Sequence, residues 1–181
     1  FCKMRARSRK SSKSIRHYTI FAVFMVAWGM SRPKLFRIID KAVFDYKLIE
    51  EGDRILVGLS GGKDSTALAE YFADRLRQGR ERFEVCALHV ESGIGSSLQT
   101  ELCEKVEAWG IPVKTICADV LVRLKPGKSM NCWWCSTQRR TELLNYAIEH
   151  KFNKIALGHH LDDILETLLM NMLDRGELST M

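Results

Sequence analysis

Short apolar segments alternate with longer amphipathic ones along the chain, and this alternation constrains the fold more than any other feature. The apolar segments have the length of buried strands, and the others carry apolar side chains at helical spacing. Strands are expected at 54–60, 82–90, 112–118 and 154–158. Helices are expected at 33–49, 65–78, 97–110, 137–151 and 161–173. Such an order requires crossover connections, so the sequence predicts an α/β fold with a doubly wound parallel sheet.

The last predicted helix has an unbroken apolar stripe, which predicts that it packs firmly on the sheet. The stripe consists of Leu161, Ile164, Leu165, Leu168, Leu169, Met172 and Leu173.

The formal charge of +6 belongs to the first residues rather than to the whole chain. Residues 1–16 contain seven Lys and Arg and no acid, whereas 21 Lys and Arg meet 22 Asp and Glu in the remainder. The apolar segment 19–30 that follows is too short to span a bilayer as a helix. We therefore expect residues 1–30 to be an extension outside the fold, with Met30 as the natural start and 31–181 as the folded domain. A targeting or membrane segment is the alternative.

The six cysteines do not form the dense framework of a small secreted protein. Cys86 and Cys117 lie in strand-like segments, where a thiol usually acts as a small apolar side chain. The pattern favours a reducing compartment, and hence a cytoplasmic protein without membrane attachment.

The first strand leads into the turn SGGKDS at residues 60–65. Gly61 and Gly62 allow backbone amides to approach a ligand, and Lys63 with the following helix N-terminus adds positive charge. This combination predicts a phosphate site. Asp64 would repel a phosphate unless a cation lay between them, which suggests Mg²⁺ and a pyrophosphate group that leaves. The alternative is a glycine-rich turn in which Asp64 is only a capping acid.

A second polar cluster, GHHLDD at 158–163, follows the last strand. In parallel sheets, ligands bind beyond the carboxyl ends of the strands. The segments 60–65, 89–95 and 158–163 should therefore converge on one site. The alternative for Asp162 and Asp163 is that of first-turn acids, which complement the helix dipole.

SGGKDS resembles the PP-loop of the ATP pyrophosphatase superfamily, and GHHLDDILET resembles a second signature of its tRNA-modifying branch. The resemblance implies an adenine-nucleotide α-hydrolase-like fold and AMP-forming chemistry. It places Mg²⁺ at Asp64 and Asp162, both with a catalytic role. It assigns ATP binding to Ser60, Gly61, Gly62, Lys63, Asp64, Ser65, Gly158, His159, Asp163 and Thr167.

The only close cysteine pair lies in NCWWCSTQRR, before a predicted helix. A zinc site requires four ligands, and the chain has no second close pair. A redox pair, two structural thiols, and an iron–sulfur or sulfur-transfer site remain as interpretations.

The cysteine pair between the two ATP motifs resembles the tRNA 2-thiocytidine synthetase family, over Pro33 to Met181. The resemblance implies ATP-dependent thiolation of a cytidine in the tRNA anticodon loop, with a sulfur donor of the cysteine desulfurase type and a homodimeric state as expectations. It makes Cys132 and Cys135 catalytic ligands of a [4Fe–4S] cluster whose third cysteine is absent here, so we expect a fragment. Candidate RNA contacts are Lys125, Lys128, Arg139 and Arg140.

Three alternatives remain on sequence grounds. A tRNA-lysidine synthetase shares both ATP motifs but has no use for the cysteine pair. A uridine thiolase usually carries further zinc-binding cysteine pairs. The third alternative is a non-catalytic nucleotide-binding or redox-sensing module.

Overall fold

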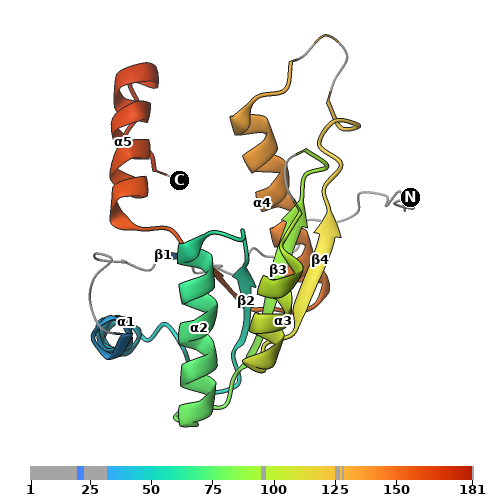
Figure 1. The fold of residues 1–181 in the computed structure, drawn as a ribbon. Coiled ribbons are helices and arrows are strands. Elements are labelled where there is room, and N and C mark those ends of the chain that lie inside the picture. Colours follow the sequence, from blue (N-terminus) through green and yellow to red (C-terminus); the bar gives the residue numbers. More distant parts are fainter. Residues whose placement is uncertain (1–19, 23–31, 95–96, 125–126, 128, 181) are drawn as a thin grey trace.

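The structure is a computed structural model that describes residues 20–22, 32–94, 97–124, 127 and 129–180. Five parallel strands form one sheet in the order β1-β5-β2-β3-β4 (Figure 1). The strands are β1 Ile20–Ala22, β2 Arg54–Gly58, β3 Glu84–Glu91, β4 Val113–Cys117 and β5 Lys154–Leu157. The helices are α1 Arg32–Asp45, α2 Lys63–Gln78, α3 Thr100–Ala108, α4 Cys132–Glu149 and α5 Leu161–Arg175. The predicted α/β fold with a parallel sheet is confirmed.

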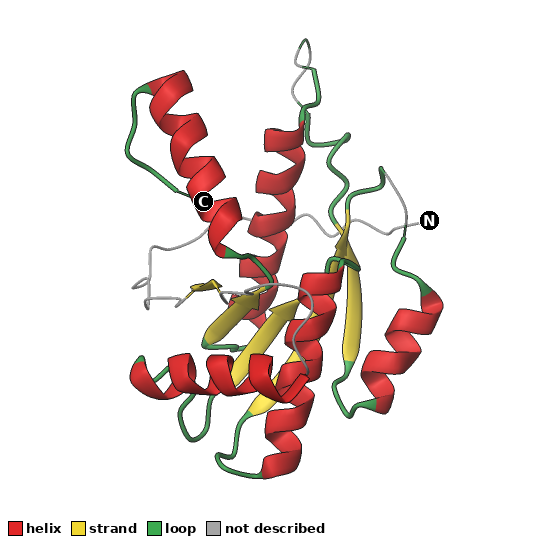
Figure 2. Ribbon diagram, turned by 60° about the vertical axis from the view of Figure 1, so that its left-hand side comes forward, coloured by secondary structure: helices red, strands yellow, loops and turns green. Residues whose placement is uncertain are grey.

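The sheet separates two apolar cores, because successive side chains of a strand point to opposite faces. On β2, Ile55 and Val57 face the core that α1, α2 and α3 cover, whereas Leu56 faces the core that α4 covers. Helices thus lie on both faces of the sheet, as Figure 2 shows, and the doubly wound arrangement is confirmed.

Helix α4 begins at Cys132, five residues before the predicted start at 137. The signal for the earlier start is Asn131, whose side-chain oxygen accepts a hydrogen bond from the Trp134 amide at 2.8 Å. Asparagine is a favoured N-cap residue because it satisfies an amide that has no partner within the helix. The cysteine pair therefore belongs to the first turn of α4 rather than to a preceding loop.

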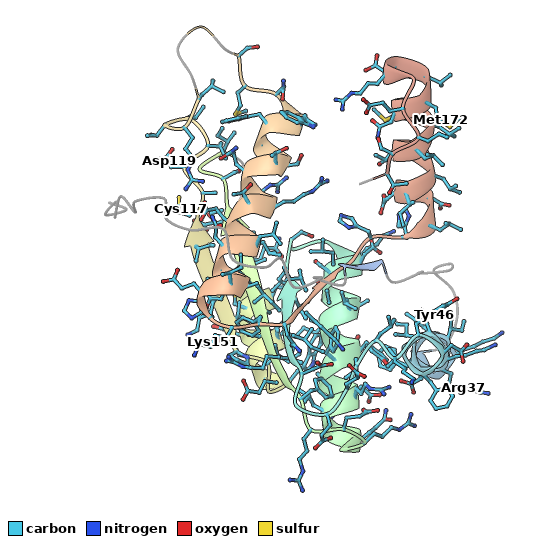
Figure 3. All side chains as sticks on the ribbon, turned by 180° about the vertical axis from the view of Figure 1, so that it is seen from behind. Arg37, Tyr46, Cys117, Asp119, Lys151 and Met172 are labelled. Atoms are coloured by element: carbon cyan, nitrogen blue, oxygen red, sulfur yellow. The ribbon has the colours of Figure 1, made fainter. Side chains whose placement is uncertain are left out.

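The prediction that the last helix packs on the sheet is wrong. No residue of α5 is buried, and five members of the apolar stripe are exposed, with Leu173 at 87%. The chain leaves the carboxyl edge of the sheet after β5, and α5 then extends beyond that edge instead of returning over a face (Figures 1 and 2). Figure 3 shows Met172 on this helix, away from the strands.

The two strand cysteines differ in their burial. Cys86 on β3 is buried, as the sequence predicted. Cys117 ends β4 and is exposed, so the expectation of a core thiol is wrong there. The physical reason is its position at the end of an edge strand, which has a neighbouring strand on one side only.

Strand β1 lies within the segment that the sequence placed outside the fold, and it pairs with β5 through Ile20 and Ile155. Residues 1–19 and 23–31, including Met30, lie outside the described residues. The boundary at residue 30 therefore stays a prediction. None of the helices described by the structure has the length and apolarity needed to cross a bilayer.

A buried cation joins α1 to α2. The Arg75 guanidinium contacts Asp40 at 2.7 Å and Glu81 at 2.6 Å, and it also donates to the Tyr71 hydroxyl at 3.1 Å. Arg75 is only 4% exposed. Burial raises the pKa of Tyr71, so its hydroxyl stays neutral beside these charges.

We predict that Arg75→Met lowers the free energy of unfolding by about 2–4 kcal/mol, because it removes the buried cation from Glu81 and leaves Asp40 paired with the more exposed Arg80. Urea denaturation of the full chain measures the change. Arg77→Met is the matched control, because Arg77 is on the same helix with a side chain that is 54% exposed in its pair with Asp74. Its effect should stay within about 0.5 kcal/mol, and equal effects of the two substitutions would contradict the prediction.

Candidate functional site

Three loops converge at the carboxyl edge of the sheet, as the sequence predicted. Gly58 of β2 is in register with Leu88 of β3 and with Leu157 of β5, so the segments after these strands are neighbours. The chain runs from β2 to β3 on one side, while β5 occupies the other side. This is the topological switch point, where α/β sheets bind ligands.

The turn at 60–65 is held in shape by its own hydroxyl groups. Ser65 Oγ donates to the Gly62 carbonyl at 3.0 Å and accepts from the Ser60 amide at 3.2 Å. Ser60 Oγ lies 3.0 Å from Ser65 Oγ and accepts from the Gly62 amide at 3.3 Å. Gly61 has a φ of +86°, a conformation that favours glycine. The two serines therefore fix the backbone around the position predicted for a phosphate.

Helix α2 starts within this segment, at Lys63, with Gly62 as N-cap and no side-chain cap. The first amides of a helix have no carbonyl partner within the helix and carry partial positive charge. Lys63 is exposed at the helix start, and Asp64 is half-buried beside it. The local geometry is that of an anion site at a helix N-terminus.

Gly158 brings the second motif against this helix start. A Cβ atom at Gly158 would lie 2.7 Å from the Ser65 amide nitrogen and 2.8 Å from the Asp64 carbonyl carbon. Both are backbone atoms that cannot move aside without displacing α2. Glycine is therefore required at position 158, because it lets the loop after β5 pack closely on the turn at 60–65, which is called the phosphate turn below.

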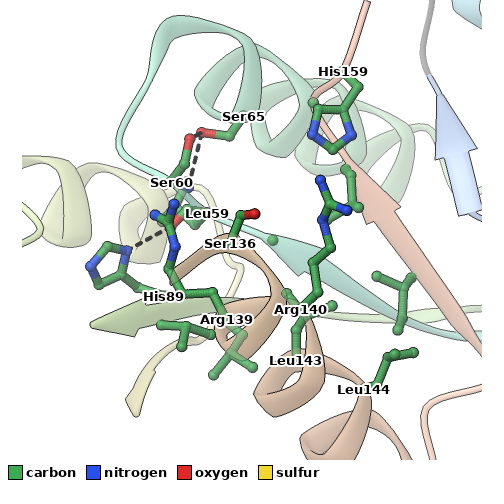
Figure 4. A pocket seen from close by; sticks show the side chains of 16 residues that line it. Leu59, Ser60, Ser65, His89, Ser136, Arg139, Arg140, Leu143, Leu144 and His159 are labelled. Atoms are coloured by element: carbon green, nitrogen blue, oxygen red, sulfur yellow. Dashed lines mark hydrogen bonds between the residues drawn. The ribbon is translucent and has the colours of Figure 1, made fainter. Parts of the chain in front are cut away.

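A cavity of about 330 Å³ lies between this edge of the sheet and α4 (Figure 4). Ser60, Ser65 and His159 line one end, and Arg139 and Arg140 of α4 face them. The remaining lining is mainly apolar, from β3, α4 and β5: Leu88, Val90, Leu143, Leu144, Ile155 and Leu157. An apolar cavity with a few polar groups at one end suits a nucleotide with its base in the apolar part.

His159 titrates below its usual range. Burial lowers the pKa of His159 below the ordinary value of 6.5. Asp163 opposes this change, whereas the positive charge of Arg140 and the neighbouring His160 lower the pKa further. The imidazole is therefore neutral at pH 7 in the absence of a ligand.

Asp163 of the second motif caps the start of α5. Asp163 accepts a hydrogen bond from the His160 amide at 3.0 Å, and its own amide donates to His160 Nδ1 at 3.3 Å. This capping box matches the structural interpretation of Asp163 that the sequence left open. The Thr167 hydroxyl donates to the Asp163 carbonyl at 2.7 Å, and Asp162 is exposed. None of these three residues lines the cavity, so their predicted contacts with ATP stay predictions.

The cysteine pair lies on the face of α4 that lines the cavity. Ser136, Arg139 and Leu143 line the cavity from α4. Residues three or four apart lie on the same face of a helix, so Cys132, four residues before Ser136, continues this face by one turn. Cys135 is four residues before Arg139 and lies next to it. Cys132 is exposed, and Cys135 is half-buried.

The described residues contain no group of three His, Cys, Asp or Glu side chains placed to hold a metal ion. Asp64 and Asp162 thus form no complete Mg²⁺ site by themselves, and no third ligand accompanies Cys132 and Cys135 in that part of the chain. Among the candidate RNA contacts, Lys125 and Lys128 lie outside the described residues.

The sequence predicted that the segment 89–95 lies at the site, but it did not single out His89, which lines the cavity. Its Nδ1 lies 2.8 Å from the Leu59 carbonyl oxygen, and its side chain is buried at the end of β3. A hydrogen bond to a carbonyl oxygen requires a proton on Nδ1 of His89. The bond holds Leu59, which lies between β2 and the turn at 60–65, against β3. The signal was available, because His89 is the single histidine in the otherwise apolar segment 85–90.

Comparison with known proteins agrees with this geometry. A family model described as a PP-loop domain matches residues 33–181. The chain belongs to the PP-loop family. The resemblance of SGGKDS to the PP-loop is therefore confirmed.

Two curated relatives are named tRNA-cytidine(32) 2-sulfurtransferase. The protein from Syntrophotalea carbinolica is 40% identical over 153 residues, which cover 82% of this chain and 58% of the relative. The protein from Nitrosospira multiformis is 38% identical over 151 residues, which cover 82% of this chain and 51% of the relative. The chain thus spans about half the length of the curated relatives it matches.

Solved structures support the fold. The U34-tRNA thiolase NcsA from Methanococcus maripaludis, solved with its [4Fe-4S] cluster, superposes with a TM-score of 0.66 at 23% identity. The match covers 81% of this chain and 52% of that one. The NH3-dependent NAD synthetase from Campylobacter jejuni superposes with a TM-score of 0.54 at 19% identity, covering 76% and 60%. The PP-loop domain therefore has the predicted adenine-nucleotide α-hydrolase-like fold.

We predict that Gly158→Ala weakens binding of Mg·ATP to the PP-loop domain by at least about tenfold, because the new methyl group displaces the start of α2. Isothermal titration calorimetry of the full chain measures the affinity. Thr100→Ala is the control, because Thr100 is exposed at the start of α3 and does not line the cavity. The prediction fails if both variants bind the nucleotide equally well.

The lowered pKa of His159 predicts a loss of stability in mild acid. Between the native pKa and 6.5, the unfolded chain binds a proton at this residue that the native protein does not. The free energy of unfolding therefore falls as the pH falls through this window, and the loss is complete below the native pKa. Denaturation of wild type and His159→Gln at pH 7.5 and 5.5 should show a smaller loss in the variant. An identical loss in both proteins would contradict the assignment.

Proposed function

We propose that this chain forms the ATP-binding and sulfur-transfer part of an enzyme that thiolates a cytidine in the anticodon loop of tRNA. The observation that supports it best is the position of Cys132, one helical turn beyond the cavity into which the PP-loop turn opens. Activation of the cytidine by ATP, followed by sulfur transfer, requires that a nucleotide and the thiols lie close together. Here the cavity and the thiol pair share one face of α4. The names of the curated relatives support the same reaction.

The cavity and the turn fit ATP. The phosphates would lie against the amides of Gly61, Gly62 and the first turn of α2, with Lys63 as the nearby cation. Ser60 and Ser65 keep the turn in the required shape. The apolar lining would take the adenine ring, and Gly158 and His159 would close the site from the side of β5.

The carboxylates fit Mg²⁺ only together with a nucleotide. Mg²⁺ is usually bound by one or two carboxylates plus substrate phosphates rather than by a cage of protein groups. Asp64 lies at the phosphate turn and Asp162 at the start of α5, so they are the residues that would hold it. When bound, the metal neutralises charge on the phosphates.

The two thiols fit two ligand positions of an iron–sulfur cluster. They are three residues apart in the first turn of α4, so both can reach one group, as cysteine pairs do in such sites. The third ligand is proposed to come from outside the described residues. A bound [4Fe–4S] cluster would present sulfur at this end of α4.

The reaction that follows has two stages. The C2 oxygen of the cytidine attacks the α-phosphorus of ATP and pyrophosphate leaves, which makes C2 electrophilic. A sulfur nucleophile held near Cys132 and Cys135 then displaces AMP. A sulfur donor of the cysteine desulfurase type, a homodimeric state and a cytoplasmic location are part of this proposal.

Variants of the two motifs test the proposal. Lys63→Ala should lower tRNA-dependent pyrophosphate release by about 100-fold or more, because it removes a positive group beside the reacting phosphates. Cys132→Ser should retain pyrophosphate release, yet abolish both the brown colour after anaerobic iron reconstitution and the thiolated product. Cys103→Ser and Lys41→Ala, whose side chains lie on α3 and α1, are the controls.

Mass spectrometry of the modified nucleoside identifies the reaction. The product 2-thiocytidine supports the proposal, whereas lysidine or 2-thiouridine would replace it with one of its alternatives. Pyrophosphate release that is independent of tRNA would contradict it.

A further inference from the structure

Trp133 is an exposed aromatic residue between the two cysteines. It is 60% exposed in the first turn of α4. Its neighbour Trp134 differs, because the Trp134 indole is half-buried and donates from Nε1 to the Val120 carbonyl at 3.2 Å. Trp134 thus holds the start of α4 against the preceding loop, whereas the Trp133 ring makes no hydrogen bond or ring contact with any other residue in the described ranges.

The helical repeat places Trp133 above the cavity. Residues at positions i, i+4, i+7 and i+11 share one side of a helix, so Trp133 shares a side with Arg140 and Leu144. Both of these residues line the cavity, and Figure 4 shows Arg140 extending toward His159. The rise from Trp133 to Arg140 is about 10 Å along α4. The indole therefore stands at the level of Cys132, beyond the nucleotide cavity and on its side of the helix.

The same part of α4 is positively charged. Arg139 and Arg140 are exposed, and neither forms an ion pair with another residue that the structure describes. An exposed aromatic ring next to cations is the combination with which proteins bind single-stranded nucleic acid: the bases stack on the ring, and the cations attract the backbone.

We propose that Trp133 is a binding residue for the target base, which leaves its RNA loop and stacks on the Trp133 indole beside Cys132. This inference rests on the proposed function and adds a specific contact to it. Stacking would hold the pyrimidine ring between the nucleotide, which activates it, and the thiols, where sulfur is supplied. Arg139 and Arg140 would attract the phosphates of the flanking RNA.

The test is the affinity of the full chain for an anticodon stem–loop RNA with a cytidine at position 32, the position in the relatives' name. Fluorescence anisotropy of the labelled RNA measures the dissociation constant. Trp133→Ala should weaken binding by about 5- to 150-fold, and Trp133→Phe should restore it to within about threefold of wild type. Ile148→Ala is the control, because Ile148 is 58% exposed at the far end of α4. All variants should bind Mg·ATP as wild type does.

A second RNA, without the base at position 32, identifies the contact. The wild type should bind this RNA as weakly as the Trp133→Ala variant binds the intact RNA. The variant should bind both RNAs with the same affinity. The inference alone is overturned if Trp133→Ala binds the intact RNA as wild type does, or if removal of the base weakens wild type and variant equally. If wild type binds no RNA while it binds Mg·ATP, the proposed function is overturned and the inference with it.

Discussion

The close approach of Gly158 to the first turn of α2 determines the geometry of the whole site. The two loops come from adjacent parallel strands, and their backbones meet at a distance that any side chain on Gly158 would prevent. The contact joins the turn at 60–65 to the histidines that precede α5 and to the acids of its first turn. Because both loops leave the sheet at its switch point, the opening between them faces the cavity under α4.

Helix α4 connects the cavity to the cysteine pair. Its buried side chains Leu143 and Ala147 anchor it to the sheet, and its first turns extend past the carboxyl edge. One face therefore carries cavity residues near the sheet and thiols further out. The separation is about 10 Å from Cys132 to Arg139, roughly the length of a nucleoside. In the proposed reaction, a single base would thus approach both the nucleotide and the thiols with little movement of the protein.

Strands β2 to β5, the parallel sheet and the convergence of the three loops could be predicted from the sequence, because apolar periodicity and crossover rules indicate them. Strand β1 and the order of the strands were not predicted. The direction of α5 could not be predicted, because an apolar stripe such as Leu165 and Leu169 indicates that a helix has a packing face but not what covers it. The exposure of Cys117 depends on its strand lying at a sheet edge, which follows from strand order alone. The start of α4 is indicated by the N-cap Asn131, which apolar periodicity does not reveal because the cap is polar.

The electrostatics of the cavity favour a polyanion. Burial lowers the pKa of His159, and the charge of Arg140 lowers it further, so the ring stays neutral while two guanidinium groups already face the phosphate turn. Charges act more strongly across an apolar lining than in water, because less solvent screens them. Phosphates that enter would therefore gain from Lys63, Arg139 and Arg140 together. Arg139 and Arg140 also lie below Trp133 on α4. In the proposed reaction a bound nucleotide and an RNA backbone would therefore share one charged helix face.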